Sequence, residues 1–108
     1  MKDLAEKKCV PCEGGVPPLN PEQINEYKKE VHNDWLVVDN KKVKRNFAFV
    51  NFIQTMEVAN KIADIAEEQG HQPDMYISYG KLEVEIWTHA INGLSENDFI
   101  LAAKIDKI

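Results

Sequence analysis

The chain has 108 residues, of which 44% are hydrophobic, and a formal net charge of −5. This length and composition predict one globular domain with its own core and argue against intrinsic disorder. The acidic balance argues against a nucleic-acid-binding face, because phosphate binding needs a basic surface. No apolar run is long enough for a membrane span and the N-terminus lacks a signal-peptide core, so we expect a cytoplasmic protein that does not bind membranes.

Residues 1–19 are interpreted as an extended N-terminal arm, because proline and glycine are frequent in them. Within this arm, Cys9 and Cys12 form a single C-x-x-C pair. A zinc site needs four ligands and no second pair follows, whereas a thioredoxin-like pair would lie at a strand-to-helix junction. The pair is therefore interpreted as part of a solvated tail that holds no metal, and disulfide pairing between subunits stays open.

Residues 20–108 are predicted to form the domain, which begins with a helix. Asn20 is a favourable N-cap, Pro21 suits the first helical position, and Gln23 can complete a capping box. Apolar residues follow at helical spacing, and we expect this helix to end near residues 32–34. Two strands joined by a hairpin should come next, within residues 35–52, since apolar residues recur there at even intervals.

The second half of the chain repeats this pattern of a helix followed by a hairpin. Thr55 is expected to cap a helix that ends before Gly70. A second hairpin is predicted over residues 74–89, with its turn near Gly80. Its second strand alternates apolar and polar residues, so one face should be buried and the other polar. A capped helix over residues 94–108 should end the chain.

The predicted order of elements is therefore α-β-β-α-β-β-α. It is typical of an α+β domain in which a four-stranded antiparallel sheet carries its helices on one face. The other face, with Glu83, Glu85 and Trp87, should be partly exposed and is a candidate partner surface. An open sheet edge favours pairing with a second subunit, so we expect a homodimer or a homotetramer.

The second hairpin should bring two of the three histidines together. With its turn at Gly80, the strand ladder places His71 opposite Thr88 and makes His89 a diagonal neighbour of His71. Pro73 has no N–H to donate, so the ladder should stop there and leave His71 in a loop. Two imidazoles at one place suit acid–base chemistry near neutral pH.

Structural interpretations of the same residues stay open. A histidine that follows the end of a helix often only interacts with the helix dipole. His32 lies beside Asp34 at a predicted helix end, and we expect it to have no part in catalysis. Asp98 has a structural explanation too, because Ser95 and Asp98 have the spacing of a capping box.

The spacing of the polar residues resembles the pattern of the pterin-4a-carbinolamine dehydratase family, also known in animals as the dimerisation cofactor of a homeodomain transcription factor. That pattern runs from an acidic residue through a histidine, then His or Asn, and a proline, to an aromatic residue, a second histidine and an aspartate. This chain has, at matching spacings, Glu67, His71, Gln72, Pro73, Tyr79, His89 and Asp98. The resemblance extends over about residues 16–108.

The resemblance implies a hydro-lyase that removes water from 4a-hydroxytetrahydrobiopterin and yields quinonoid dihydropterin. This reaction recycles tetrahydrobiopterin for aromatic amino acid hydroxylases, so such a hydroxylase is a candidate pathway partner. It also implies acid–base catalysis by His71 and His89, with no metal and no organic cofactor. By the same resemblance, the substrate-binding residues would be Gln72, Pro73, Thr88, Ala90 and Ile91. The residues that support the site would be Glu67 and Asp98.

Gln72 departs from the family pattern, which usually has His or Asn at this position. Glutamine offers the same amide groups as asparagine but cannot transfer a proton near pH 7. Activity should survive if this position orients the substrate, and fall if it moves protons. Members of the family also serve as dimerisation partners of a transcription factor, so the alternative function is an interaction module or transcriptional coactivator.

Overall fold

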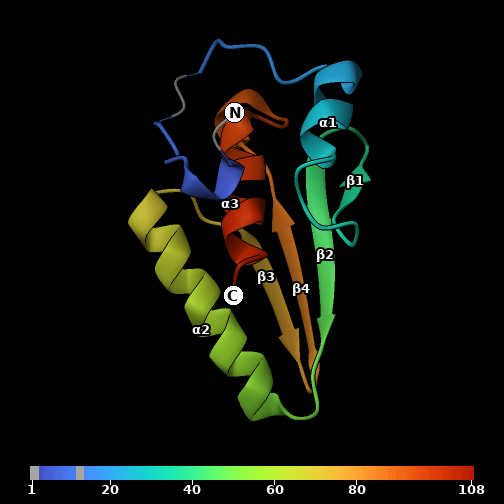
Figure 1. The fold of residues 1–108 in the computed structure, drawn as a ribbon, viewed down its shortest axis with the longest axis vertical. Coiled ribbons are helices and arrows are strands. Elements are labelled where there is room, and N and C mark those ends of the chain that lie inside the picture. The colour runs from blue at the N-terminus through green and yellow to red at the C-terminus, as the bar shows by residue number, and fades with distance from the viewer. Residues whose placement is uncertain (1–2, 12–13) are drawn as a thin grey trace.

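The computed structural model describes residues 3–11 and 14–108. A four-stranded antiparallel sheet of order β1-β2-β4-β3 has its helices on one face, which confirms the predicted α+β fold (Figure 1). In chain order the elements are the short 3-10 helix η1 (Leu4–Glu6), α1 (Pro21–Lys28), β1 (Leu36–Val38), β2 (Lys42–Ala48), α2 (Phe52–Gln69), β3 (Asp74–Ser78), β4 (Lys81–Ile86), the 3-10 helix η2 (His89–Ile91) and α3 (Glu96–Ile105).

The register of the sheet follows from the alternation of apolar residues in β4. Leu82, Val84 and Ile86 are all buried on the face that the helices cover. In β2, Val43 lies opposite Ile86, so the two central strands bury the same face. A side-chain period of two residues fixes this register, because a slip by one residue would turn every apolar side chain to solvent.

The β3–β4 hairpin has the turn that the sequence predicts. Ser78 pairs with Lys81, and Gly80 takes the left-handed φ of 69°. A Cβ atom at Gly80 would lie 2.8 Å from the carbonyl oxygen of Phe49, so only glycine fits this approach. The pairing stops at Asp74, directly after Pro73, as expected for a residue without an N–H.

Helix α1 begins as predicted but ends earlier. The side chain of Asn20 accepts from Gln23 N, and the side chain of Gln23 accepts from Asn20 N, which completes the capping box. The helix ends at Lys28 rather than near residues 32–34. The backbone N–H of His32 donates instead to the carboxylate of Asp106, which ties this segment to the end of α3.

Helix α2 begins three residues before the predicted cap. Asn51, not Thr55, is its N-cap, and the Asn51 side chain accepts from Gln54 N at 2.8 Å. Thr55 is buried within the first turn and its hydroxyl donates to Asn51 O. Asparagine caps helices at least as well as threonine, and this cap also shortens the predicted second strand. Gly70 ends the helix with a left-handed φ, as expected.

The N-terminal segment is not the solvated arm that its composition suggests. Leu4 in η1 is only 2% exposed and belongs to the core, and Lys104 Nζ donates to the carbonyl oxygen of Ala5. The segment packs on α3 (Figure 1). Helix α3 is buried on nearly all sides, so a further element has to cover the side away from the sheet. The interpretation as a solvated tail is therefore wrong at Leu4, which is buried, and at Cys9, which is partly buried; Cys12 lies outside the described residues.

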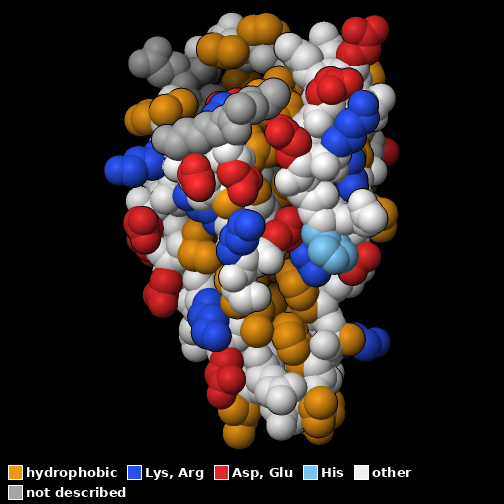
Figure 2. Space-filling model, in the orientation of Figure 1, with side chains coloured by type: hydrophobic (Ala, Val, Ile, Leu, Met, Phe, Trp, Pro, Cys, Tyr) orange, Lys and Arg blue, Asp and Glu red, His pale blue; other side chains and the backbone are white. Residues whose placement is uncertain are grey.

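One end of the molecule carries a group of exposed apolar side chains. Figure 2 shows apolar side chains gathered at the end where β2 leads into α2 and where the β3–β4 hairpin turns. The exposed apolar residues there include Val50, Phe52, Ile53 and Tyr79. His71 lies at the opposite end of that hairpin. Within the described ranges, no helix is long and apolar enough to cross a membrane.

Candidate active site

A buried carboxylate organises the open end of the β3–β4 hairpin. Asp98 lies in the first turn of α3 and is fully buried. Its Oδ1 is 2.6 Å from His71 Nε2, while its Oδ2 accepts from Thr88 Oγ1 at 2.9 Å and from Ser95 N at 2.8 Å. These three donors offset the cost of burying a charge. Asp98 therefore caps the helix, as predicted, and also holds a histidine.

Local structure places His71 on this carboxylate. Gly70 ends α2, His71 N then donates to Ala66 O, and Pro73 delays the start of β3. A carboxylate at Nε2 favours the tautomer that carries its proton on that nitrogen, which leaves Nδ1 as the acceptor. No protein group in residues 3–11 and 14–108 hydrogen-bonds to Nδ1. His71 can therefore accept a proton from a bound molecule, and Asp98 would stabilise the imidazolium.

His89 has a different environment from His71. It begins η2, is exposed, and its ring packs on Trp87 with the two centroids 3.9 Å apart. Trp87 is fixed in turn by a hydrogen bond from its Nε1 to Asp74 Oδ2. The described part of the chain offers the imidazole ring of His89 no hydrogen-bond partner. Both ring nitrogens of His89 are thus open to a ligand.

Both histidines line one open cleft of about 770 Å³, a volume sufficient for a small organic ligand. Ile91 is not part of it and lines a separate hollow of about 270 Å³. Asp98 lies behind the wall that His71 and Thr88 form. The predicted site residues that the structure brings together around the cleft are Glu67, His71, Gln72, Pro73, Thr88, His89 and Ala90.

Glu67 and Gln72 form an exposed polar rim. Gln72 Nε2 is 3.5 Å from Glu67 Oε1, a weak contact that leaves both side chains free to bind a ligand. Thr88 differs, because its N–H and carbonyl groups bond within the η2 turn and its hydroxyl binds Asp98. Thr88 thus positions other groups. Across the described ranges, no group of three or more His, Cys, Asp or Glu side chains could hold a metal ion.

Several residues that line the cleft were not predicted from the sequence. They come from the N-terminal segment, the start of β3, the end of β4 and the first turn of α3: Cys9, Val10, Pro11, Asp74, Trp87 and Asn97. Burial raises the pKa of the Cys9 thiol to about 11, with a smaller contribution from Asp98. The thiol is therefore protonated near neutral pH and is no nucleophile there. For the residues of the N-terminal segment, the sequence signal is the unbroken apolar run 99–103 in α3, which needs cover on more than one side.

Comparison with known proteins identifies the family. The model of a family described as pterin 4 alpha carbinolamine dehydratase matches residues 17–108. A protein of Rickettsia canadensis, provisionally named as such a dehydratase, is 53% identical over 106 residues, which cover 98% of this chain and 97% of that protein. One of Rubrobacter xylanophilus, named in the same way, is 44% identical over the full length of both chains. The chain belongs to the pterin-4a-carbinolamine dehydratase family.

Solved structures agree with this membership of the pterin-4a-carbinolamine dehydratase family. A crystal structure of a transcriptional coactivator/pterin dehydratase from Brucella melitensis superposes with a TM-score of 0.77 at 27% identity, covering 83% of this chain and 96% of that one. A pterin dehydratase-like RuBisCO assembly factor of the alpha-carboxysome has a TM-score of 0.59 at 20% identity, which shows the fold alone. Because one fold can carry several roles, the activity has to be argued from the site.

Proposed function

We propose that this protein is a 4a-hydroxytetrahydrobiopterin dehydratase, which releases water and quinonoid dihydropterin during tetrahydrobiopterin recycling. One observation carries the proposal: two histidines line the same cleft, His71, which is held on the buried carboxylate of Asp98, and His89, whose ring has no hydrogen-bond partner among the described residues. The family membership supplies the substrate class.

The proposed elimination needs one proton donor and one proton acceptor. The bond between C4a and the hydroxyl oxygen breaks, and a protonated imidazole gives that oxygen its proton, so that water leaves. The other imidazole takes the proton of a ring N–H, whose electron pair forms the new double bond. Asp98 favours a positively charged ring at His71, so His71 suits the proton-accepting step and His89 the donating step. The open cleft lets solvent restore both rings.

Neighbouring groups suit a flat, polar ring system. Trp87 and Pro73 offer planar or apolar surface, and the rim carboxylate of Glu67 and amide of Gln72 can bind ring N–H and carbonyl groups. Gln72 orients the pterin in this proposal and transfers no proton. Imidazoles carry both proton transfers, so the mechanism invokes neither a metal nor an organic cofactor.

A direct dehydratase assay tests this proposal without assuming a pathway. Freshly generated 4a-hydroxytetrahydropterin is mixed with the protein, and formation of quinonoid dihydropterin is followed against the uncatalysed rate. We expect a rate above that background in proportion to protein concentration. A rate equal to background from a correctly folded sample would overturn the proposal.

The name of the Brucella melitensis relative, which includes a transcriptional coactivator, supports an interaction module as the second candidate function. Two features suit protein contacts. Edge strands β1 and β3 are open in this chain, and Leu36 and Tyr76 on them are largely exposed. We propose that an edge pairs with a second subunit in a homodimer or homotetramer. Sedimentation as a monomer at micromolar concentration would contradict the assembly.

A further inference from the structure

Residues 9–11 lie before the part of the chain that the family model matches, yet they form one wall of the cleft. The wall is Cys9, Val10 and Pro11, which face the His71 loop and the η2 turn across the same cavity. None of the residues that carry the proposed chemistry lies in this wall. It therefore contributes contact surface to the cleft.

This wall is fixed by two side-chain amides, those of Asn97 and Gln69. Val10 N donates to Asn97 Oδ1 at 3.0 Å, and Asn97 Nδ2 donates back to Val10 O at 2.6 Å. Cys9 N donates to Gln69 Oε1 at 2.9 Å, near the end of α2. Asn97 is buried, so two of its hydrogen-bonding groups are committed to one residue of the wall. A segment held at both Cys9 and Val10 has a set position relative to the cleft.

The side chain of Val10 is exposed although its backbone is fixed. It remains 66% exposed, at the edge of a cleft whose other rim is polar. Ordering a backbone costs free energy, and burial of the largely exposed Val10 side chain offsets little of that cost. A flat ligand in the cleft would cover this apolar surface and release the water on it.

The same turn of α3 holds two walls of the cleft. Asn97 binds Val10, and the next residue, Asp98, binds His71. The distance between the N-terminal wall and the proposed proton acceptor is therefore set by consecutive residues of one helix. Such an arrangement can hold a ligand in a set position relative to His71.

We propose that residues 9–11 are part of the ligand-binding site: Val10 contacts the bound pterin, and Asn97 is the positioning residue that holds Val10 in place. The identity of the ligand rests on the proposed function. The contact is apolar, so it should affect substrate affinity more than the chemical step.

A matched pair of valine variants tests the contact. Val10→Ser should raise KM for 4a-hydroxytetrahydropterin roughly three- to tenfold, with a smaller effect on kcat, because a methyl-rich surface is lost at the ligand. Val50→Ser is the control, since Val50 is also highly exposed but lies at the other end of the molecule. It should leave both constants unchanged.

Asn97→Ala tests the positioning role. We expect a rise in KM at least equal to that of Val10→Ser, measured well below the midpoint of thermal unfolding. A purely structural role would lower the unfolding temperature without changing KM. Binding of 7,8-dihydropterin, which lacks the 4a-hydroxyl, is followed in parallel through the fluorescence of Trp87, which lines the cleft. Its affinity should fall in both variants.

Three outcomes distinguish failure of this inference from failure of the proposed function. If the wild-type protein is active and Val10→Ser and Asn97→Ala keep its KM and its affinity for dihydropterin, the inference is wrong and the function stands. If the wild-type protein neither turns over the carbinolamine nor binds dihydropterin, the proposed function fails and the inference fails with it. If the wild-type protein binds dihydropterin without turning over the carbinolamine, and Val10→Ser weakens that binding, the inference stands and the proposed function fails.

Discussion

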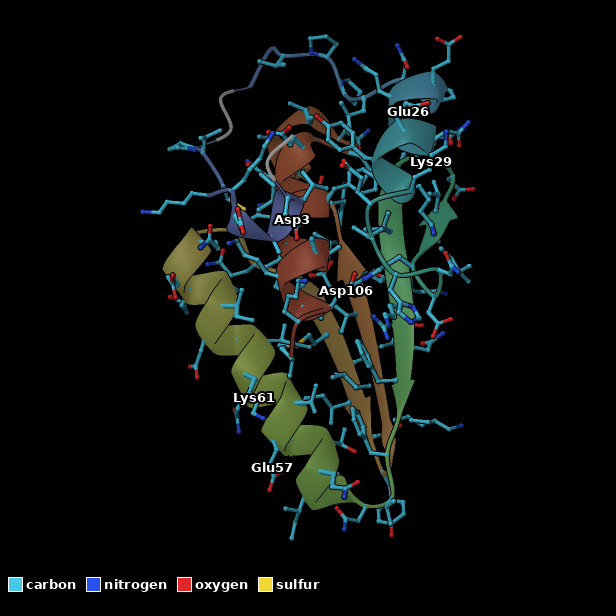
Figure 3. The ribbon with its side chains drawn as sticks, in the orientation of Figure 1. Asp3, Glu26, Lys29, Glu57, Lys61 and Asp106 are labelled. Carbon is cyan, nitrogen blue, oxygen red and sulfur yellow. The ribbon has the colours of Figure 1, made fainter. Side chains whose placement is uncertain are left out.

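Helix α3 carries a hydrogen-bonded carboxylate at each end, and the two differ in what they hold. Asp98, in the first turn, accepts from a histidine, a threonine and a backbone N–H. Asp106, which Figure 3 labels at the C-terminal end, accepts from Trp35 Nε1 at 2.8 Å, Arg45 Nη1 at 2.6 Å and His32 N at 2.8 Å. Each carboxylate thus has three donors.

The donors and the space beside them decide which end can do chemistry. Arg45 stays charged at any physiological pH and so exchanges no proton, and the hollow beside it has a volume of about 140 Å³. Its charge offsets the unfavourable position of a carboxylate at a helix C-terminus. His71 can gain and lose a proton and faces a cleft of about 770 Å³. A carboxylate with three donors therefore has a structural role at Asp106 and is suited to catalysis at Asp98.

The histidine variants should show the largest effect at the Asp98 end. His71→Ala and His89→Ala should each lower kcat by roughly 10²–10⁴-fold, the usual loss for a general acid or base. His32→Ala is the control, because His32 bonds only locally and to Asp106. Circular dichroism and oligomer size must match the wild type in each case. Full dehydratase activity in the folded double variant would refute the mechanism.

Substituting each carboxylate by its amide compares the two ends directly. Asp98→Asn should lower kcat at least about tenfold, since the amide no longer stabilises a charged His71 ring. Asp106→Asn should lower the free energy of unfolding by about 1–3 kcal/mol through the weakened Arg45 pair, with kcat within about twofold of wild type. Urea unfolding and the dehydratase assay measure the two quantities. Equal losses of kcat would show that the ends do not differ as argued.

Much of the fold could be predicted because its signals are local. Asn20 with Gln23 is a capping pattern, Gly80 marks a turn, and alternation along β4 sets the register. Where a local signal had a competitor, prediction failed: Thr55 and Asn51 are both good caps, and the chain uses Asn51. Both side chains offer an oxygen that can accept from a helix N–H, so spacing alone could not select between them.

The site could be predicted only as far as the hairpin register reaches. Pairing across β3 and β4 brings His71 near Thr88. The family resemblance implies that Asp98 supports the site, but the contact of Asp98 with His71 is seen only in the structure. That contact joins residues 27 apart and depends on where α3 packs. The hydrogen bond between Val10 and Asn97 joins residues 87 apart and depends on how the N-terminal segment packs. The proline- and glycine-rich composition of that segment suggested a solvated arm instead.

Gln72→His should have a modest effect on catalysis. Gln72 lies on the exposed rim, and its one side-chain contact in the described structure is the 3.5 Å approach to Glu67. If this position only orients the pterin, kcat should stay within about threefold of wild type and the change should appear in KM. A large gain in kcat would show instead that glutamine leaves the enzyme short of a proton-transfer group.

The smallest expected effect concerns Glu96, a third carboxylate of α3. Its side chain forms a partly exposed ion pair with Lys7. Hydrogen bonds from Tyr27 and then Lys7 hold the pKa of Glu96 below its usual value of 4.5. A lowered pKa means that this contribution to stability is complete above about pH 4.5 and is lost as pH falls through the folded value.

Tyr27→Phe removes the hydroxyl at 2.7 Å but keeps the stacking on Phe99. Its free energy of unfolding should fall by about 0.5–1 kcal/mol at pH 6, because solvent screens the pair, and by less near pH 3. Urea unfolding of the wild type and of the variant at both pH values measures the difference in their free energies of unfolding. Titration of the other carboxylates affects both proteins equally and cancels in this difference. An identical loss at both pH values would show that the hydroxyl does not act through the ionised carboxylate.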